Sequence, residues 1–168
     1  MSPATCLNAP ECGQHREPGH ILVGFAHDPN DWISRVMAWF THADYTHVVM
    51  ISPSGEEYIE ASSVGKPRGV RAGRVEDFLR KPNAVVRTIE HPNPDGVWID
   101  ACSQIGKQYD YQWLLGWLFR RPDWQRTRKW VCSELIAWAC ERRGRALFRG
   151  DHQWWVTPQM IYMVSEDA

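Results

Sequence analysis

The 168-residue sequence lacks any apolar run long enough to cross a membrane, since its longest mostly apolar stretches, such as residues 111–119, are far shorter than about 20 residues. Its N-terminus also lacks the basic segment and apolar stretch of a secretory signal peptide, so we expect synthesis in the cytoplasm. Positive charge is not in excess, because 19 Lys and Arg stand against 20 Asp and Glu. This balance argues against a dedicated nucleic-acid-binding protein.

The cysteines do not indicate a disulfide framework. The five cysteines occur without a secretion signal, and we therefore expect thiols. A zinc site made of Cys6, Cys12, His15 and His20 is the less favoured alternative, because these spacings match no standard zinc finger. The prediction is a protein without a metal or a cofactor.

The length fits one domain. Residues 1–19 contain Pro, Gly and Cys with little apolar periodicity, and we interpret them as an irregular N-terminal arm. Residues 20–168 form the domain. Apolar and β-branched patterns predict strands over residues 20–26, 45–51, 56–62 and 84–89. Helical periodicity predicts helices over residues 32–40, 76–80, 97–105, 111–119 and 131–143, and a last short helix opened by Thr157-Pro158. The predicted fold class is α+β, with a small antiparallel sheet packed against helices.

The charges are unevenly distributed along the chain. Residues 120–149 contain nine Arg and Lys and three acidic residues, so this segment carries +6 and the remainder −7. A solvated basic surface is the favoured interpretation. An electropositive rim that attracts an anionic substrate or a lipid head group is the alternative.

The strongest chemical signal is a cysteine at the start of a predicted helix, in residues 130–139 (WVCSELIAWA). The apolar stripe of this helix is made of Leu135, Ile136, Trp138 and Ala139. Cys132 therefore lies in the first turn, where unpaired N–H groups and the positive end of the helix dipole stabilise a thiolate and a developing oxyanion. Alone the signal is weak, because such a cysteine is more often a small buried residue.

A base for this thiol is available on a predicted strand. His47 lies between Thr46 and an apolar stretch. If Ser52-Pro53-Ser54-Gly55 closes a four-residue turn, the numbers of paired residues sum to 107 and His47 falls opposite Glu60. A carboxylate there accepts the imidazole N–H and fixes its tautomer. A bulge at Gly55 would instead turn Glu60 to the other face.

Four blocks, in this order, resemble the circularly permuted NlpC/P60 family of papain-like proteins, which includes YiiX-like proteins and the lecithin retinol acyltransferase group. The blocks are THVVMI at 46–51, YIEA at 58–61, GKQYDY at 106–111 and WVCSEL at 130–135. The resemblance implies a papain-like core, with Cys132 as nucleophile, His47 as base and Glu60 as the orienting third residue. It also implies that Tyr109 and Asp110 frame the cleft, and Tyr45 is predicted to bind substrate with them.

We predict that the protein is a cysteine-dependent hydrolase that cleaves an amide bond. The favoured substrate is a peptide bond of bacterial peptidoglycan. Because we find no export signal, we expect a phage tail or a secretion assembly to deliver the protein to the cell wall. The protein partners would then be components of that assembly. One alternative is a lipid-directed thiolesterase or acyltransferase. Another is a non-catalytic structural or docking module of a larger assembly.

Overall fold

The computed structural model describes residues 19–27, 35, 38–39, 42–110, 129–149 and 156–168. The predicted arm before residue 19, the predicted helix over residues 111–119 and most of the predicted helix over residues 32–40 lie outside these ranges. In the described residues the fold is α+β, with a six-stranded antiparallel sheet and four helices.

The sheet is built around β1 (Gly19–Ala26), a strand whose apolar residues are buried on both faces. The order of the strands across the sheet is β4-β3-β2-β1-β5-β8. The other five strands are β2 (His47–Ile51), β3 (Glu57–Ser62), β4 (Gly69–Arg74), β5 (Val85–His91) and β8 (Glu166–Asp167). Every neighbouring pair in this sheet is antiparallel.

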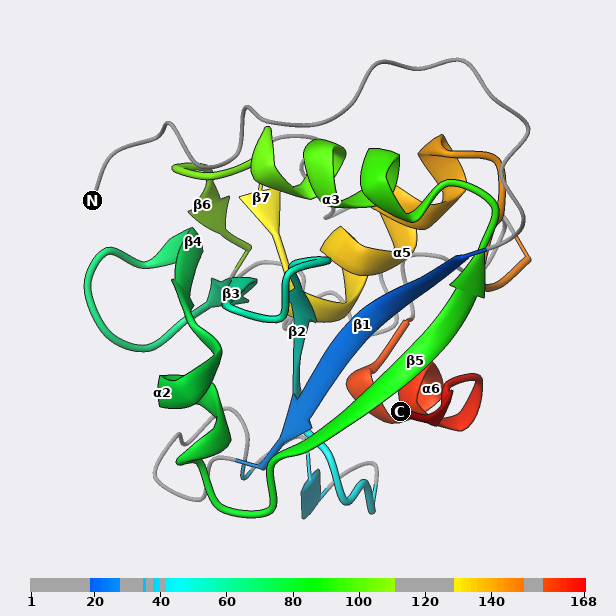
Figure 1. Ribbon diagram of the computed structural model, residues 1–168. Helices are drawn as coiled ribbons and strands as arrows, with labels where there is room; N and C mark the ends of the chain where they lie inside the picture. The colour runs from blue at the N-terminus through cyan, green and yellow to red at the C-terminus, as the bar shows by residue number, and fades with distance from the viewer. Residues whose placement is uncertain (1–18, 28–34, 36–37, 40–41, 111–128, 150–155) are drawn as a thin grey trace.

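Helices cover both faces of the sheet. The helices α3 (Pro94–Cys102), α5 (Cys132–Arg142) and α6 (Pro158–Met163) contribute to one apolar cluster that includes Val23, Val48 and Met50. On the opposite face, α2 (Val75–Leu79) adds two residues to a smaller cluster around Val49 and Tyr58. Figure 1 shows α3 and α5 side by side above the sheet and α2 away from them.

The strands over residues 20–26, 45–51, 56–62 and 84–89 are confirmed as β1, β2, β3 and β5, with small differences at their ends. The helices over 76–80 and 131–143 are confirmed as α2 and α5 to within one residue at each end. The helix over 97–105 is confirmed as α3, but it begins and ends three residues earlier than predicted. Thr157 caps α6 by accepting from the Met160 N–H at 3.3 Å. None of the helices in the described ranges is long and apolar enough to cross a bilayer.

Strand β4 was not predicted, because its sequence GVRAGR has little strand propensity. Its pairing with β3 over six residue pairs supplies what local preference lacks. Gly69, with a φ of +116°, lies so close to the Lys107 carbonyl oxygen that a Cβ there would collide with it. This close approach lets the Val70 N–H donate to the Lys107 carbonyl oxygen at 2.8 Å. The hydrogen bond joins the edge strand β4 to residues 106–110.

A small second sheet pairs β6 (Gln108–Tyr109) with β7 (Lys129–Trp130) in parallel. Neither two-residue strand was predicted. Strand β7 leads through Val131 directly into α5. Residues 108–110 are therefore attached to the segment that carries Cys132.

The predicted register of the β2–β3 hairpin was wrong by two residues. Met50 pairs with Ile59 and Ile51 with Tyr58, so the numbers sum to 109 rather than 107. The Gly55 N–H donates to the Ser52 carbonyl oxygen at 2.9 Å, as the predicted turn requires. The first hydrogen bond between the two strands, however, is the one from the Ser52 N–H to the Glu57 carbonyl oxygen at 2.8 Å, so the loop is longer than predicted. A shift of two residues leaves every side chain on its predicted face.

Candidate active site

Cys132 is the first residue of α5 and is buried, with 5% of its surface exposed. The helix begins there because Val131 is extended, with φ −104° and ψ 155°, and because buried Leu135, Ile136 and Ala139 anchor the following turns against the sheet. The first turn of a helix presents N–H groups that have no acceptor within the helix. Cys132 is therefore placed beside groups that stabilise negative charge.

His47 is the first residue of β2, and its side chain is mostly buried, with 13% exposed. Its Nε2 atom lies 2.6 Å from Oε2 of Glu60. Its imidazole is also hydrogen-bonded to the Cys132 side chain. Because Nε2 is occupied by the carboxylate, Nδ1 is the nitrogen that remains for the thiol. The structure thus brings together the three residues that the sequence predicted as one site.

The pairing of His47 and Glu60 survives the register error because the two side chains share a face. If the observed register continues along both strands, Val49 lies opposite Glu60. His47 lies two residues before Val49 on β2 and is therefore a diagonal neighbour of Glu60. Diagonal neighbours are separated by about 7–8 Å, which long side chains can bridge. The prediction that His47 stands directly opposite Glu60 is therefore corrected to a diagonal contact.

The surroundings of His47 favour its charged form. Burial lowers the pKa of His47, but hydrogen bonds to Cys132 and Glu60 and the negative charges of both groups outweigh it and raise the pKa to about 9. At neutral pH the imidazole is therefore mainly protonated. A protonated imidazole beside a thiolate is the charge state of an activated cysteine–histidine pair.

Glu60 lies at the centre of a charged cluster that the sequence did not predict. It is 1% exposed, and its Oε1 atom accepts from Nε of Arg71 at 2.8 Å and lies 2.6 Å from the second guanidinium nitrogen, Nη2. The Nζ atom of Lys81 lies 3.6 Å from Oε2. Arg71 could have been found only as the strand partner of Glu60 on β4, a strand that the sequence pattern does not reveal.

This cluster keeps Glu60 ionised. Burial by itself would raise the pKa of the carboxyl group, but the hydrogen bond to His47 and the positive charges of His47, Lys81 and Arg71 lower the pKa to well below its ordinary value. Glu60 is therefore a carboxylate throughout the neutral range. It can accept the His47 N–H and hold the ring in one orientation.

The C-terminal segment links the two halves of this site. Ser133, next to Cys132, donates from its hydroxyl to the carbonyl oxygen of Val156 at 2.6 Å within the core. Three residues later, Gln159 accepts the backbone N–H groups of Asp44 and Tyr45 at 3.1 and 3.2 Å, just before His47. Residues 156–159 therefore join the start of α5 to the start of β2.

We expect Gln159→Ala to slow the alkylation of Cys132 by iodoacetamide by roughly tenfold, because a displacement of about 1 Å between reacting groups can cost more than that. Gln159→Glu, which keeps an oxygen acceptor for the two N–H groups, should retain most of the rate. Mass spectrometry of peptides from the alkylated protein measures the alkylation rate of Cys132 separately from that of the other cysteines. Equal rates in Gln159→Ala and the unchanged protein would show that the link does not set the geometry.

Tyr109 and Asp110 lie beside the strand that leads to Cys132. Both are buried, Tyr109 pairs with Trp130, and the Asp110 N–H donates to the Trp130 carbonyl at 3.1 Å. They are therefore close to the nucleophile along the backbone, as a cleft-framing role requires. Their contact with substrate stays a prediction.

Tyr45 packs into an aromatic group with Phe25 and Tyr162, at ring distances of 5.8 and 4.5 Å. Burial and the neighbouring Tyr162 raise the pKa of its phenol. The Tyr45 ring is thus engaged between β1 and α6, although its backbone lies two residues from His47. A role in binding substrate stays a prediction.

The other described thiols and histidines have different surroundings. Cys140 is buried, and burial raises the pKa of its thiol to about 12, so it is protonated at neutral pH. His91 is fully buried, and its two ring nitrogens contact the Cys140 carbonyl and the Asn93 N–H at 3.1 and 3.0 Å. Burial lowers the pKa of His91, so it is a neutral structural group.

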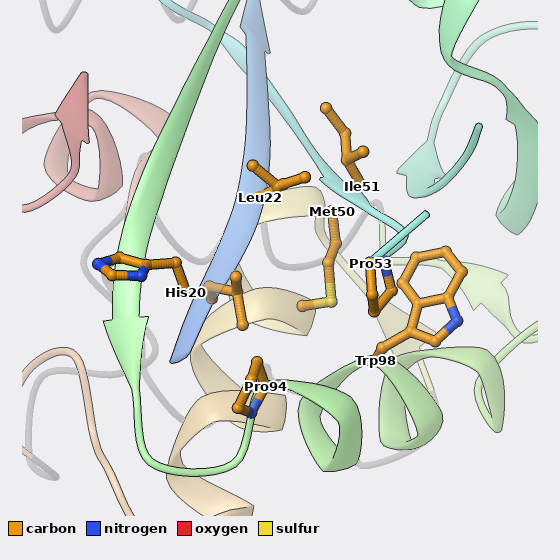
Figure 2. Close-up of a pocket in the computed structure, with 8 residues that line it drawn as sticks. His20, Leu22, Met50, Ile51, Pro53, Pro94 and Trp98 are labelled. Atoms are coloured by element: carbon orange, nitrogen blue, oxygen red, sulfur yellow. The ribbon is translucent and has the colours of Figure 1, made fainter. Parts of the chain in front are cut away.

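No cluster of three His, Cys, Asp or Glu side chains able to hold a metal occurs in the described ranges. Of the alternative zinc ligands, Cys6, Cys12 and His15 lie outside these ranges. His20 lies on β1, where it lines a cavity of about 10 Å³, enough for one water molecule. Figure 2 shows this cavity at the Ile51 end of β2, whereas His47 begins that strand.

The described part of the basic segment is largely paired. Arg143 donates from two nitrogens to Asp100 at 2.7 and 2.8 Å, and Arg142 lies 3.3 Å from the same carboxylate. Arg145 lies 3.8 Å from Glu90. These arginines belong to ion pairs between elements of the fold, while residues 120–128 lie outside the described ranges.

Comparisons with models of known protein families and with curated proteins give no match for this chain. The case for its function therefore rests on the fold, on the geometry around Cys132 and on the sequence blocks described above.

Proposed function

We propose that this protein is a cysteine-dependent amide hydrolase of the circularly permuted NlpC/P60 type, with a papain-like arrangement of its core. The observation that carries the proposal is the hydrogen-bonded series Cys132–His47–Glu60, formed by a helix start and two adjacent strands. A buried carboxylate that orients an imidazole, which in turn contacts a thiol, is the arrangement that nucleophilic cysteine chemistry requires.

The reaction would follow from this geometry. In the thiolate–imidazolium pair, Nδ1 of His47 holds the proton that Cys132 has given up, and the thiolate attacks the carbonyl carbon of the substrate. N–H groups at the start of α5 stabilise the oxyanion. As the carbon–nitrogen bond breaks, the imidazolium gives its proton to the leaving amine, and an acyl-thioester remains on Cys132. His47 then removes a proton from water, which attacks the thioester and releases the acid and the thiol.

For the substrate we propose a peptide amide of bacterial peptidoglycan. The support is the resemblance of four sequence blocks, in order, to a family whose members act on such bonds. Delivery by a phage tail or a secretion assembly is part of this proposal. The lipid-directed and non-catalytic alternatives become distinct outcomes of the test.

The test is incubation of the full chain and of Cys132→Ala with purified peptidoglycan, followed by mass spectrometry of the released fragments. We expect new amine and carboxyl ends with the unchanged protein and none with Cys132→Ala. Cys140→Ala is the matched control, because Cys140 lies on the same helix but is a protonated core thiol. It should retain cleavage.

Parallel incubation with phospholipid vesicles separates the alternatives. Release of fatty acid without cleavage of peptidoglycan would replace the proposed substrate with a lipid. If neither substrate reacted and alkylation of Cys132 left the biological activity intact, the protein would be a non-catalytic module.

A further inference from the structure

The charged cluster around Glu60 contains more positive charge than orienting a histidine requires. Strands β2, β3 and β4 and the turn after α2, which carries Lys81, contribute to it, and α5 contributes the thiol. Among the residues that the structure describes, the ionisable groups that face Glu60 and His47 from these segments are Cys132, Tyr58, Arg71 and Lys81. The phenol of Tyr58 is neutral, because burial and the charge of Glu60 raise its pKa to about 12.

Arg71 is held firmly against Glu60 by the loop that precedes β4. Its Nη1 atom donates to the Pro67 carbonyl at 3.4 Å. A Cβ at Gly65 would lie 2.6 Å from that nitrogen, so the guanidinium packs directly against the glycine backbone. Both sides of the guanidinium are therefore engaged, with Glu60 on one side and residues 65–67 on the other.

Lys81 approaches the other oxygen of the carboxylate. Its ammonium lies 3.6 Å from Oε2, the same atom that contacts His47, and 5.6 Å from the centre of the Phe78 ring. The lysine and the imidazole therefore share one oxygen. Positive charge at this position competes with the imidazolium for the negative charge of Glu60.

We propose that Arg71 and Lys81 are positioning residues that partly neutralise Glu60, so that it orients His47 without binding the imidazolium too tightly to release its proton. The inference rests on the proposed function. An unneutralised buried carboxylate would stabilise the imidazolium strongly, and a strongly stabilised imidazolium is a poor general acid for the leaving amine. Paired with an arginine, the carboxylate acts more like a neutral acceptor.

The sign of the effect separates this role from a purely structural one. Removing a positive charge near His47 stabilises the imidazolium, so the pKa of His47 rises above its present value. A substitution that only loosened the site would weaken the contacts with Glu60 and Cys132, and the pKa of His47 would fall toward its ordinary value.

The experiment is an NMR titration of the His47 imidazole in the full chain and in Arg71→Gln, Lys81→Gln, Arg71→Lys and Arg74→Gln. We expect the midpoint to rise by roughly one pH unit in Arg71→Gln and to rise in Lys81→Gln. Arg71→Lys keeps the charge and should stay near the unchanged protein. Arg74→Gln, an exposed arginine of the same strand, is the control and should leave the midpoint in place.

A second readout is the ratio of two rates at neutral pH. Alkylation of Cys132 needs only the thiolate, whereas amide hydrolysis also needs a proton from His47. In Arg71→Gln we expect amide turnover to fall by about tenfold with little change in alkylation. Lys81→Gln, in which the lysine is 29% exposed, keeps the test available if Arg71→Gln does not fold.

A midpoint that stayed in place or fell in both Arg71→Gln and Lys81→Gln would overturn the inference and leave the proposed function intact. One other result would overturn both this inference and the proposed function. If His47 in the unchanged protein titrated at its ordinary pKa and Cys132→Ala did not alter it, the cysteine–histidine pair itself would be absent.

Discussion

Replacing His47 with alanine is expected to lower the rate of peptidoglycan cleavage by at least about 1,000-fold, because the substitution removes both the base for Cys132 and the acid for the leaving amine. The loss should exceed that of any other single histidine. His47 is the described histidine that contacts both a thiol and a buried carboxylate. Fragment release, measured by mass spectrometry at equal concentrations of folded protein, gives the ratio.

Two comparisons make this prediction specific. His20→Ala alters an exposed histidine of the same sheet and should leave cleavage unchanged. The alkylation rate of Cys132 at neutral pH should fall in His47→Ala, because the imidazolium partner of the thiolate is gone. Cleavage within tenfold of the unchanged protein in His47→Ala would exclude His47 as the base and with it the proposed mechanism.

Replacing Glu60 with glutamine is expected to lower the free energy of unfolding by about 3 kcal/mol, which is typical when one member of a buried charged group is removed. The neutral amide has nearly the same shape. It leaves Arg71, Lys81 and the protonated His47 without the negative charge between them. Urea-induced unfolding of the two proteins measures the difference.

The pH dependence of that difference follows from the lowered pKa of Glu60. A carboxyl group whose pKa is lower in the folded protein adds stability above its unfolded pKa, and this stability is lost as the pH falls through the folded pKa. The difference between the two proteins should therefore be full above about pH 5 and shrink in more acidic solution. Glu57→Gln, on the same strand but half-buried, is the control and should change stability little.

The double variant Glu60→Gln/Arg71→Gln tests the cause. If the loss comes from an uncompensated arginine, removing that arginine recovers part of it, and the two changes are not additive. Additive losses would show that the carboxylate and the guanidinium contribute independently. Turnover in Glu60→Gln should fall less than in His47→Ala, because the amide oxygen can still orient the ring.

The contrast between β1 and β4 shows which strands local sequence can predict. The stretch ILVGFA within β1 is apolar throughout, because a strand in the middle of a covered sheet buries both faces. The sequence GVRAGR of β4 carries no such pattern, and its strand exists because β3 and the Lys107 carbonyl supply hydrogen-bond partners. Strand propensity reflects the local preference of a segment and contains no information about pairing partners far along the chain.

The candidate site divides in the same way. The sequence by itself determined that Cys132 begins a helix and that His47 and Glu60 lie on neighbouring strands, because each follows from short-range periodicity. Only the tertiary structure decided the register of the hairpin, the contact of the helix start with the strand, and the placement of Arg71 and Lys81 at the carboxylate. These depend on pairing and packing between residues distant in sequence, and such contacts leave no local pattern to detect.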